Sequence, residues 1–463
     1  MQKRILFLVD HKHRDLPSLS LIGYLLKEKG HSVEFSTLGD EEKKWETYIP
    51  HLVVANKQIG DNTRLQLCKA HGIKRAVINT EGARRKGRLL TIEVPPELIF
   101  YWNEDEFNRY RIVPELKKVQ HKLAGSPRLD FLTKPFEVLY PTKQELLAEL
   151  GMNEKNFTVT IATHTVAAFH SPELQEFKRK QLKEVFNIAL DYDTIFNNSV
   201  ENLKVTVEFL KNHVKDFPEI NFVLKPHPNE DVNFWKQLIE KEINLPNLKL
   251  VLGMTINEFL GCSDLHIAHN GCTTTAEALL KQIPTIEILS KNYEKIFPED
   301  RMELANFKVW NDKEILESLL FEKKQSRKGK LSNYLAKPEI EEYLFGNFYK
   351  SDSKRCFEHF KVLHKFTQEI TIEPIRDNKQ IKKLQKSREK KFMQYGLRYE
   401  LGAIKRNIFR SKTPMDKTKT SGDPRGRYDN SIKPGDEKYW FDKFEKAGFN
   451  ISFFESLPES NKN

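Results

Sequence analysis

The sequence predicts an α/β protein made of two Rossmann-type units that face a central cleft, followed by a helical C-terminal extension. The continuous apolar run Ile5–Val9, then a helical pattern and a strand at His31–Phe35, is how an open parallel sheet begins. A fresh strand at Phe157–Ala162 starts a second series in which strands and helices alternate. The chain of 463 residues also exceeds the roughly 150 residues of one ordinary domain.

We divide the chain accordingly into four regions. Residues 1–150 are expected to form an N-terminal Rossmann-like domain and residues 151–312 a second one. Residues 313–375 are expected to be a helical closing segment, in which the charged stretch 322–330 is a loop. Residues 376–463 are expected to form a basic, partly disordered tail.

The individual elements follow from apolar runs and their periodicity. In the first unit, a helical pattern from Leu19 to Leu26 ends at Gly30, which suits the left-handed residue after a helix. A helix at Arg64–His71 lies between expected strands at Leu52–Ala55 and Ala76–Ile78. The second unit has expected strands at Ile220–Leu224, Leu248–Val251, Leu265–Ala268 and Thr285–Ile288, and expected helices at Ser199–Val214, Ile256–Cys262 and Thr273–Lys281.

The net charge of +11 is concentrated in the tail. From Arg376 onward there are 22 Lys or Arg against 12 Asp or Glu. Such a tail suits an anionic membrane surface, where each cation adds about 1 kcal/mol; a solvated tail is the alternative. Because the remainder is close to neutral, nucleic acid is not the expected partner. The aromatic groups Tyr439–Phe441 and Phe453–Phe454 are expected to dock, either on the body or on another molecule.

Several functional classes are excluded by what the sequence lacks. No stretch approaches the roughly 18 apolar residues of a membrane helix, and the N-terminus lacks the pattern of a signal peptide. We therefore expect a cytoplasmic protein, peripheral on the inner face of the membrane if the tail binds lipid. The four cysteines form no C-x-x-C pair and predict no metal site. Dinucleotide and P-loop glycine motifs do not occur in the required context, so no cofactor is expected.

The strongest functional pattern runs from Asn270 to Glu277, where a strand leads through a hydroxyl-rich turn into a helix. Gly271 allows a sharp turn, and Thr273, Thr274 and Thr275 offer hydroxyl donors. The unpaired first N–H groups of a helix bind phosphate without a lysine. Glu277, one turn in, is placed to reach ribose hydroxyls. The alternative is a capped core helix with a threonine N-cap.

A second pattern is Lys225-Pro226-His227-Pro228, which follows the strand Ile220–Leu224. The two prolines restrict the loop and hold the imidazole. A fixed His227 can donate to a phosphate or stabilise a departing nucleotide, and Lys225 adds a positive charge. The alternative is a loop histidine without function.

A third pattern, Asn79-Thr80-Glu81-Gly82, follows a strand of the first unit. Glu81 can act there as general base on an acceptor hydroxyl, whereas the alternative is a solvated turn glutamate. Two other groups are set aside. His11 and His13 show no further ligand nearby, and Asp191-Tyr192-Asp193 does not follow an identifiable strand, as a D-x-D metal motif would.

Three segments carry a family resemblance: Gly125–Asp130, Lys225–Pro228 and His269–Glu277. They resemble the bacterial surface carbohydrate (polysaccharide) biosynthesis family. This family is GT-B-like and related to CDP-glycerol glycerophosphotransferases and to bacterial Kdo and sialic-acid transferases. The resemblance covers residues 1–370.

The resemblance implies binding of a cytidine nucleotide by His227, Pro228 and Thr273–Thr275, with Arg128 and Asp130 shaping the interdomain cleft. In the related sialyltransferases, a motif made of an acidic residue, Asp and Gly supplies the base. Thr80-Glu81-Gly82 is similar to this motif but lacks the middle Asp.

The expected function is a metal-independent glycosyltransferase, with residues 1–150 as acceptor domain and 151–312 as nucleotide-donor domain. It would transfer a sugar from a nucleotide-activated donor to a glycan or lipid-linked acceptor of capsule or lipopolysaccharide. Three alternatives remain: a CDP-glycerol-type polyol-phosphate transferase, a sugar-nucleotide epimerase, and a non-catalytic scaffold of a glycan assembly complex.

Overall fold

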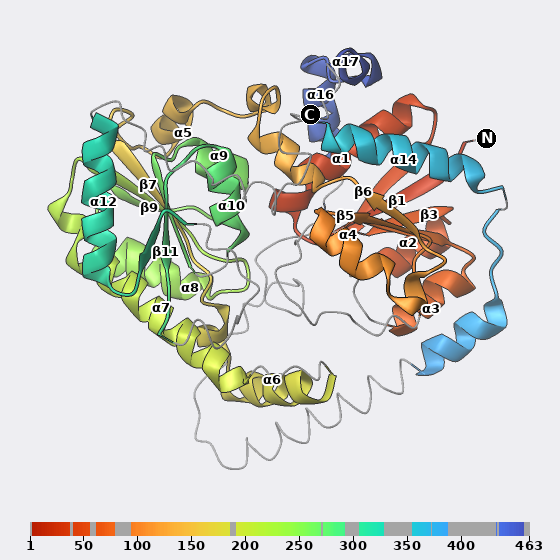
Figure 1. The fold of residues 1–463 in the computed structure, drawn as a ribbon, viewed down its shortest axis with the longest axis horizontal. Helices are drawn as coiled ribbons and strands as arrows, with labels where there is room; N and C mark the ends of the chain where they lie inside the picture. Colours follow the sequence, from red (N-terminus) through yellow and green to blue (C-terminus); the bar gives the residue numbers. More distant parts are fainter. Residues whose placement is uncertain are drawn as a thin grey trace.

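The computed structural model describes residues 2–37, 40–55, 62–78, 94–185, 191–269, 272–291, 305–327, 354–371, 373–387, 432 and 435–457. Within these residues, two parallel six-stranded sheets lie side by side, each with helices on its faces (Figure 1). The α/β class and the helical C-terminal region predicted from the sequence are confirmed. The domain boundary near residue 150 stays a prediction, although none of the described strands of one sheet pairs with a described strand of the other.

The first sheet has the strand order β2-β1-β3-β4-β5-β6, and every neighbouring pair is parallel. Alternate residues of β1 enter different cores: Ile5 and Phe7 pack with α1, whereas Leu6 and Leu8 pack with Trp45. Burial on both faces explains why this strand is a continuous apolar run. The strands are β1 (Arg4–Val9), β2 (Ser32–Thr37), β3 (Leu52–Ala55), β4 (Lys74–Ile78), β5 (Leu98–Tyr101) and β6 (Gln120–Leu123).

The second sheet has the order β12-β11-β10-β7-β8-β9 and is also parallel. Its apolar residues form a core with those of α7 (Tyr192–Asn212) and α12 (Asp312–Arg327). The strands are β7 (Phe157–Ala162), β8 (Ile220–Lys225), β9 (Leu248–Leu250), β10 (Leu265–His269), β11 (Thr285–Ile288) and β12 (Phe307–Val309).

The helices of the first unit are α1 (Lys12–Glu28), α2 (Glu41–Thr47), α3 (Asn62–Ala70) and α4 (Glu104–Arg111), with short 3₁₀ helices η1 (Pro114–Leu116), η2 (Pro127–Leu132) and η3 (Phe136–Leu139). Gly30 follows α1 with φ of +83°, as predicted. α5 (Lys143–Glu149) leads to the second unit, which contains α6 (Pro172–Val185), α7 (Tyr192–Asn212), α8 (Val232–Lys236), α9 (Ile256–Gly261) and α10 (Thr273–Leu280), with the 3₁₀ turns η4 (Val166–Phe169) and η5 (Val214–Asp216) and the π-helical turn η6 (Gln237–Ile243).

The C-terminal extension differs from the prediction in one respect. The helix α12 (Asp312–Arg327) continues through most of the stretch 322–330 that was predicted to be a loop. Its charged residues are held by the body, because Glu322 is buried and Lys323 pairs with Glu219. Charge alone therefore did not indicate a solvated loop.

The last helices return to the first unit (Figure 1). They are α14 (Arg355–Glu369), a helix at 378–387, α16 (Asp436–Lys446) and α17 (Ile451–Ser456). Trp440, Phe444, Phe449 and Phe454 are all buried in the core that contains α1. The predicted docking of the terminal aromatic residues therefore occurs on the body of the protein.

The segment η2 joins the two units and α14. Its Phe131 packs in the α1 core, whereas Leu129 and Leu132 pack in a cluster with Phe259 and Ala276 of the second unit. Asp130 is fully buried between them. Its carboxylate accepts from Arg355 Nη1 at 3.0 Å and from the backbone N–H of Cys356, in the first turn of α14, at 2.7 Å.

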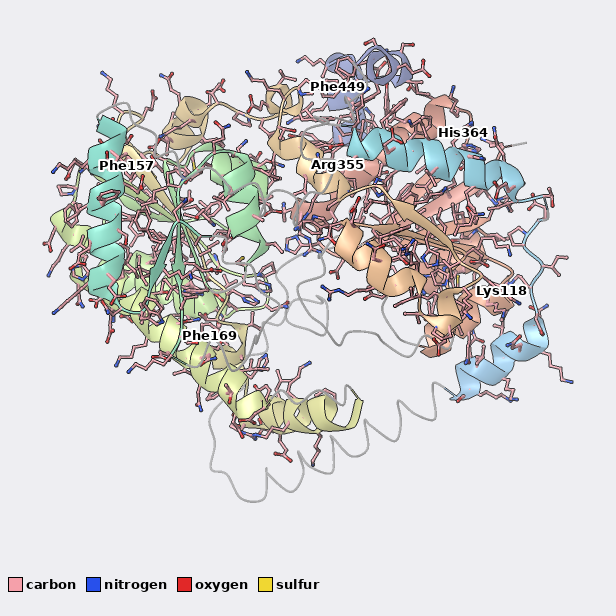
Figure 2. The ribbon with its side chains drawn as sticks, in the orientation of Figure 1. Lys118, Phe157, Phe169, Arg355, His364 and Phe449 are labelled. Carbon is pink, nitrogen blue, oxygen red and sulfur yellow. The ribbon has the colours of Figure 1, made fainter. Side chains whose placement is uncertain are left out.

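Arg355 lies at the junction of the units, at the opposite end of α14 from His364 (Figure 2). It also packs against Gly125, where an added Cβ would lie 3.1 Å from Arg355 Cδ and where φ is +69°. Only glycine suits this turn, because the positive φ and the close side chain both disfavour a Cβ.

We expect that Arg355→Met lowers the free energy of unfolding by about 3–5 kcal/mol, because it leaves the buried Asp130 carboxylate without its counter-charge. The double variant Arg355→Met/Asp130→Asn should recover a substantial part of this loss. Urea denaturation of the two single variants and the double variant measures the coupling. Strictly additive losses would show that the buried pair is not coupled.

Candidate functional site

Strand order locates the expected ligand edge of each sheet. In open parallel sheets, ligands bind beyond the carboxyl ends of the strands, where neighbouring strands are followed by connections in opposite directions. In the first sheet this point lies between β1 and β3, next to the turn that contains Asp10 to His13. In the second it lies between β7 and β10, which are followed by His164 and by the α10 turn.

His227 is held by backbone hydrogen bonds at the end of β8. The backbone N–H of Asn229 donates to its Nδ1 at 3.1 Å. Since Nδ1 accepts, the proton of the neutral ring lies on Nε2, which is then a hydrogen-bond donor. The backbone N–H of His227 donates to Thr163 Oγ1 at 3.3 Å. The geometry therefore makes Nε2 a hydrogen-bond donor, and its binding of a phosphate stays a prediction.

Glu230 fastens this loop to the one after β7. Its buried carboxylate accepts from Trp235 Nε1 at 2.9 Å, from Thr165 Oγ1 at 3.0 Å, and closely from Thr163 Oγ1 and the backbone N–H of Thr165. Burial raises the pKa of Glu230, whereas these hydrogen bonds oppose the rise. Sequence reasoning gave Glu230 no role, because its partners only meet it in the folded chain.

His164 is a second imidazole at this edge, and it is exposed, whereas His227 is half-buried. Its ring centroid lies 5.1 Å from that of His227. Its backbone N–H donates to Nδ1 of His269 at 2.7 Å, so the loop after β7 is fixed to the end of β10. His269 Nε2 in turn contacts Thr206 Oγ1 of α7 at 2.7 Å. Two histidines thus lie side by side at the point where strand order predicts a ligand.

The helix α10 begins at this edge, as predicted. In the part of the chain that the structure describes, the side chain of its N-cap residue, Cys272, makes no capping hydrogen bond to the helix. The three threonines differ in environment. Thr274 Oγ1 contacts His266 Nε2 at 3.0 Å and Cys272 Sγ at 3.1 Å, whereas Thr275 is fully buried and Thr273 is half-buried.

Two predicted donor-binding residues already have protein partners. Glu277 is buried, and its Oε1 lies 3.3 Å from Nη2 of Arg128, which stacks over Trp102. Lys225 donates to the carbonyl oxygen of Met254 at 2.6 Å. Burial lowers the pKa of Lys225 to about 8. Their binding roles stay predictions, as do those of Arg128 and Asp130 at a cleft.

His13 lies at the amino end of α1, and its electrostatic neighbours include residues of the second unit. Burial lowers its pKa, and so do Lys225 of β8 and Lys12, whereas Glu258 of α9 opposes them. His13 and the donor-side loops are therefore close enough to interact electrostatically. The sequence analysis set His13 aside, and strand order is the signal that identifies its position.

Three predicted site residues, Glu81, Asn270 and Gly271, lie outside the described residues, as do Thr80 and Gly82. Pro228 is described and half-buried beside His227. Asp191 is the N-cap of α7 and accepts from the backbone N–H groups of Asp193 and Thr194. This structural role accounts for the D-x-D pattern that the sequence analysis set aside.

The described residues show no metal site and no membrane-spanning helix, and one hollow away from the candidate site. Among them, no group of three or more His, Cys, Asp or Glu side chains is placed to hold a metal ion. No helix among them is long and apolar enough to cross a membrane. A hollow of about 380 Å³ lies at the opposite, amino end of the second sheet; its lining includes the ion pairs Lys143–Asp264 and Lys323–Glu219.

No family model and no curated protein matches the sequence. Among solved structures, a variant of the wall teichoic acid polymerase TagF has a TM-score of 0.52 and 12% identity, over 80% of this chain and 89% of that chain. TagF soaked with CDPG for 15 minutes has a TM-score of 0.50 and 13% identity, over 79% of this chain and 89% of that chain. MnaA of S. aureus with UDP has a TM-score of 0.49 and 11% identity, over 81% of this chain and 99% of that chain. The likeness to TagF shows that the fold is GT-B.

The buried histidines predict an acid-sensitive second unit. Complete burial lowers the pKa of His266 and of His269 from 6.5 to about 3. Each is neutral when folded but protonated when unfolded below pH 6.5, so its contribution to stability is present above 6.5 and is lost as the pH falls toward 3. Protonation of each histidine in the unfolded chain should lower the free energy of unfolding by about 2 kcal/mol between pH 7 and pH 5.

Urea denaturation at pH 7 and at pH 5 should show that the free energy of unfolding falls less in His266→Gln than in the wild type, by the contribution of this one histidine. An unchanged pH dependence in the variant would contradict the assignment of a neutral, buried His266.

Proposed function

We propose that the protein is a glycosyltransferase of surface polysaccharide biosynthesis that uses a nucleotide-activated sugar, with a cytidine nucleotide favoured. The observation that carries this proposal is the pair of adjacent imidazoles, His164 and His227, at the carboxyl edge of the second sheet. Their position matches the ligand edge of the GT-B fold, and the Nε2 donor of His227 suits an anionic oxygen.

On the donor side, the nucleotide phosphate would lie between His227 and the amino end of α10. The ring donates from Nε2, and the aligned peptide dipoles of α10 favour negative charge. Both imidazoles are fixed before the reaction: the Glu230 network holds the His227 loop, and His269 holds the loop of His164. Preformed dipoles stabilise charge that develops on the leaving nucleotide.

On the acceptor side, a base would take the proton of an acceptor hydroxyl while its oxygen forms the new bond to the sugar carbon. The bond from that carbon to the donor phosphate oxygen breaks, and the nucleotide leaves with its electron pair. Glu81 is the base that the sequence predicts. His13 is the second candidate, because it faces Lys225 and Glu258 across the two units and its lowered pKa keeps it unprotonated at neutral pH.

A polyol-phosphate transferase is the second candidate function. TagF, a wall teichoic acid polymerase that has been solved with CDPG, shares the fold at a TM-score of 0.50. In such a reaction the acceptor hydroxyl attacks phosphorus, so that the product gains phosphate and CMP departs. The acceptor would be a glycan or lipid-linked glycan at an anionic membrane surface contacted by the basic tail. The reaction as proposed assigns no step to a metal ion.

We expect a cytidine nucleotide or its sugar to raise the melting temperature of the wild type. A ligand at about 100 times its dissociation constant adds roughly 2.7 kcal/mol to stability. His227→Ala should lose most of this shift, because it removes the Nε2 donor. The measurement is a thermal-shift screen of CMP, CDP, UDP, GDP and their sugars.

The matched control is His213→Ala. His213 Nε2 lies 2.9 Å from Asp312 Oδ2. His213 follows the end of α7 that leads into β8, so it lies at the amino end of the second sheet, opposite the candidate site. This variant should keep the full nucleotide shift. If the nucleotide raised the melting temperature of His227→Ala as much as that of the wild type, the assignment of His227 to the donor site would be wrong. If no nucleotide raised the melting temperature of the wild type, a non-catalytic scaffold would be favoured. Turnover of the donor without an acceptor would indicate the epimerase.

The base should be separable from the nucleotide site by kinetics. Loss of a general base reduces kcat by about 10²–10⁴-fold. We expect this loss in either Glu81→Gln or His13→Asn, with the nucleotide-induced thermal shift retained in both. Nucleotide release in the presence of acceptor is the assay. If both variants kept full activity, neither residue would be the base.

A further inference from the structure

The C-terminal helix pair α16–α17 is an integral part of the first unit. Phe444 and Phe454 are fully buried, and Phe444 lies 6.1 Å from Phe131 of η2 between ring centroids. Lys443 Nζ donates to the carbonyl oxygen of Leu139 at 2.6 Å. Phe449 lies within this pair, above α1 (Figure 2). Apolar packing and this hydrogen bond thus hold the pair against the first unit.

One charged residue of this pair reaches the candidate site. Asp436, the first residue of α16, places Oδ2 at 2.7 Å from Nζ of Lys12, the first residue of α1. Both side chains are about one-fifth exposed. Lys12 directly precedes His13, so a residue from near the end of the chain contacts the turn after β1.

This contact compensates an unfavourable arrangement. The amino end of a helix is its positive end, where cations are disfavoured. The amino end of α1 nevertheless carries Lys12, His13 and Arg14. Arg14 is paired with Asp10 and Asp15 of its own turn. Lys12 receives its carboxylate from α16 instead.

We propose that α16 completes the acceptor side of the site, with Asp436 as a positioning residue that holds Lys12 and thereby fixes the charge and orientation of the turn presenting His13. This inference rests on the proposed function only in giving His13 a place on the acceptor side. The contact itself is a property of the folded chain without substrate.

The charges that face His13 come from four elements. Lys12 on α1 and Lys225 on β8 lower its pKa in addition to burial, whereas Glu258 on α9 and Asp436 on α16 raise it. The ring of His11, 6.2 Å away between centroids, is a further titratable neighbour on its own turn, which also carries Asp10, Arg14 and Asp15. Removing the Asp436 charge should therefore shift the titration of His13 downward, and removing the Lys12 charge should shift it upward.

Asp442 provides a matched control on the same helix. It pairs with Lys438 at 2.6 Å on the exposed surface of α16. Asp442→Asn and Asp436→Asn therefore make the same change in charge and shape, but only the second lies at the site.

The experiment is an NMR titration of ¹³C-histidine-labelled full-length protein, in which a His13→Gln variant assigns the His13 signal. We expect Asp436→Asn to lower the His13 midpoint and Lys12→Met to raise it, with Asp442→Asn unchanged. In the transfer assay, Asp436→Asn should lower kcat and shift its acidic limb to lower pH. The nucleotide-induced thermal shift should be unchanged.

Equal His13 midpoints in the Asp436 and Asp442 variants would overturn the proposal. A melting temperature of Asp436→Asn close to that of Asp442→Asn verifies that docking of α16 persists, so a shifted midpoint then reports the contact and not the loss of the helix. The titration needs no ligand. A protein that binds no nucleotide but shows the shift would refute the proposed function while leaving the positioning role of Asp436 intact.

Discussion

The arrangement of the molecule depends on one buried carboxylate, Asp130. It lies in η2, whose apolar side chains enter the cores of both units, and it binds the first turn of α14 through Arg355 and the backbone of Cys356. A buried charge needs such partners, because without them its desolvation is strongly unfavourable. Asp130 thereby fixes the position of η2 relative to the closing helix. The next polar residue of η2, Arg128, pairs with Glu277 on α10. The orientation of the two units thus follows from a few neighbouring side chains.

That orientation matters for chemistry because each sheet has its own ligand edge. The second sheet presents His164, His227 and the start of α10. Partly buried hydrogen bonds hold the backbone of His164 and the ring of His227 in place. The first presents His13, whose electrostatic neighbours include Lys225 of the second unit and Asp436 near the end of the chain. A transferase needs such a division, with one unit stabilising the leaving group and the other orienting the attacking hydroxyl. Rigid support of both groups reduces the reorganisation needed during reaction.

The sequence predicted most of the strands, because burial on both faces of a parallel sheet makes a strand such as β1 a continuous apolar run. It also identified the His227 loop and the α10 turn, whose prolines and threonines follow directly after strands. It missed features that depend on distant contacts. Glu230 acquires its partners Thr163 and Thr165 only by folding, and His13 is recognised only once the order of strands is known. Residues 322–327 were predicted to be a loop from their charge, although pairing of Lys323 with Glu219 lets α12 continue.

A crystal structure with a bound cytidine nucleotide would test the central claim most directly, since it locates the phosphate. The account predicts a phosphate oxygen within hydrogen-bond distance of His227 Nε2 and next to the first turn of α10. Binding instead at the amino end of the second sheet, in the hollow lined by Lys143, Lys155 and Lys323, would contradict it.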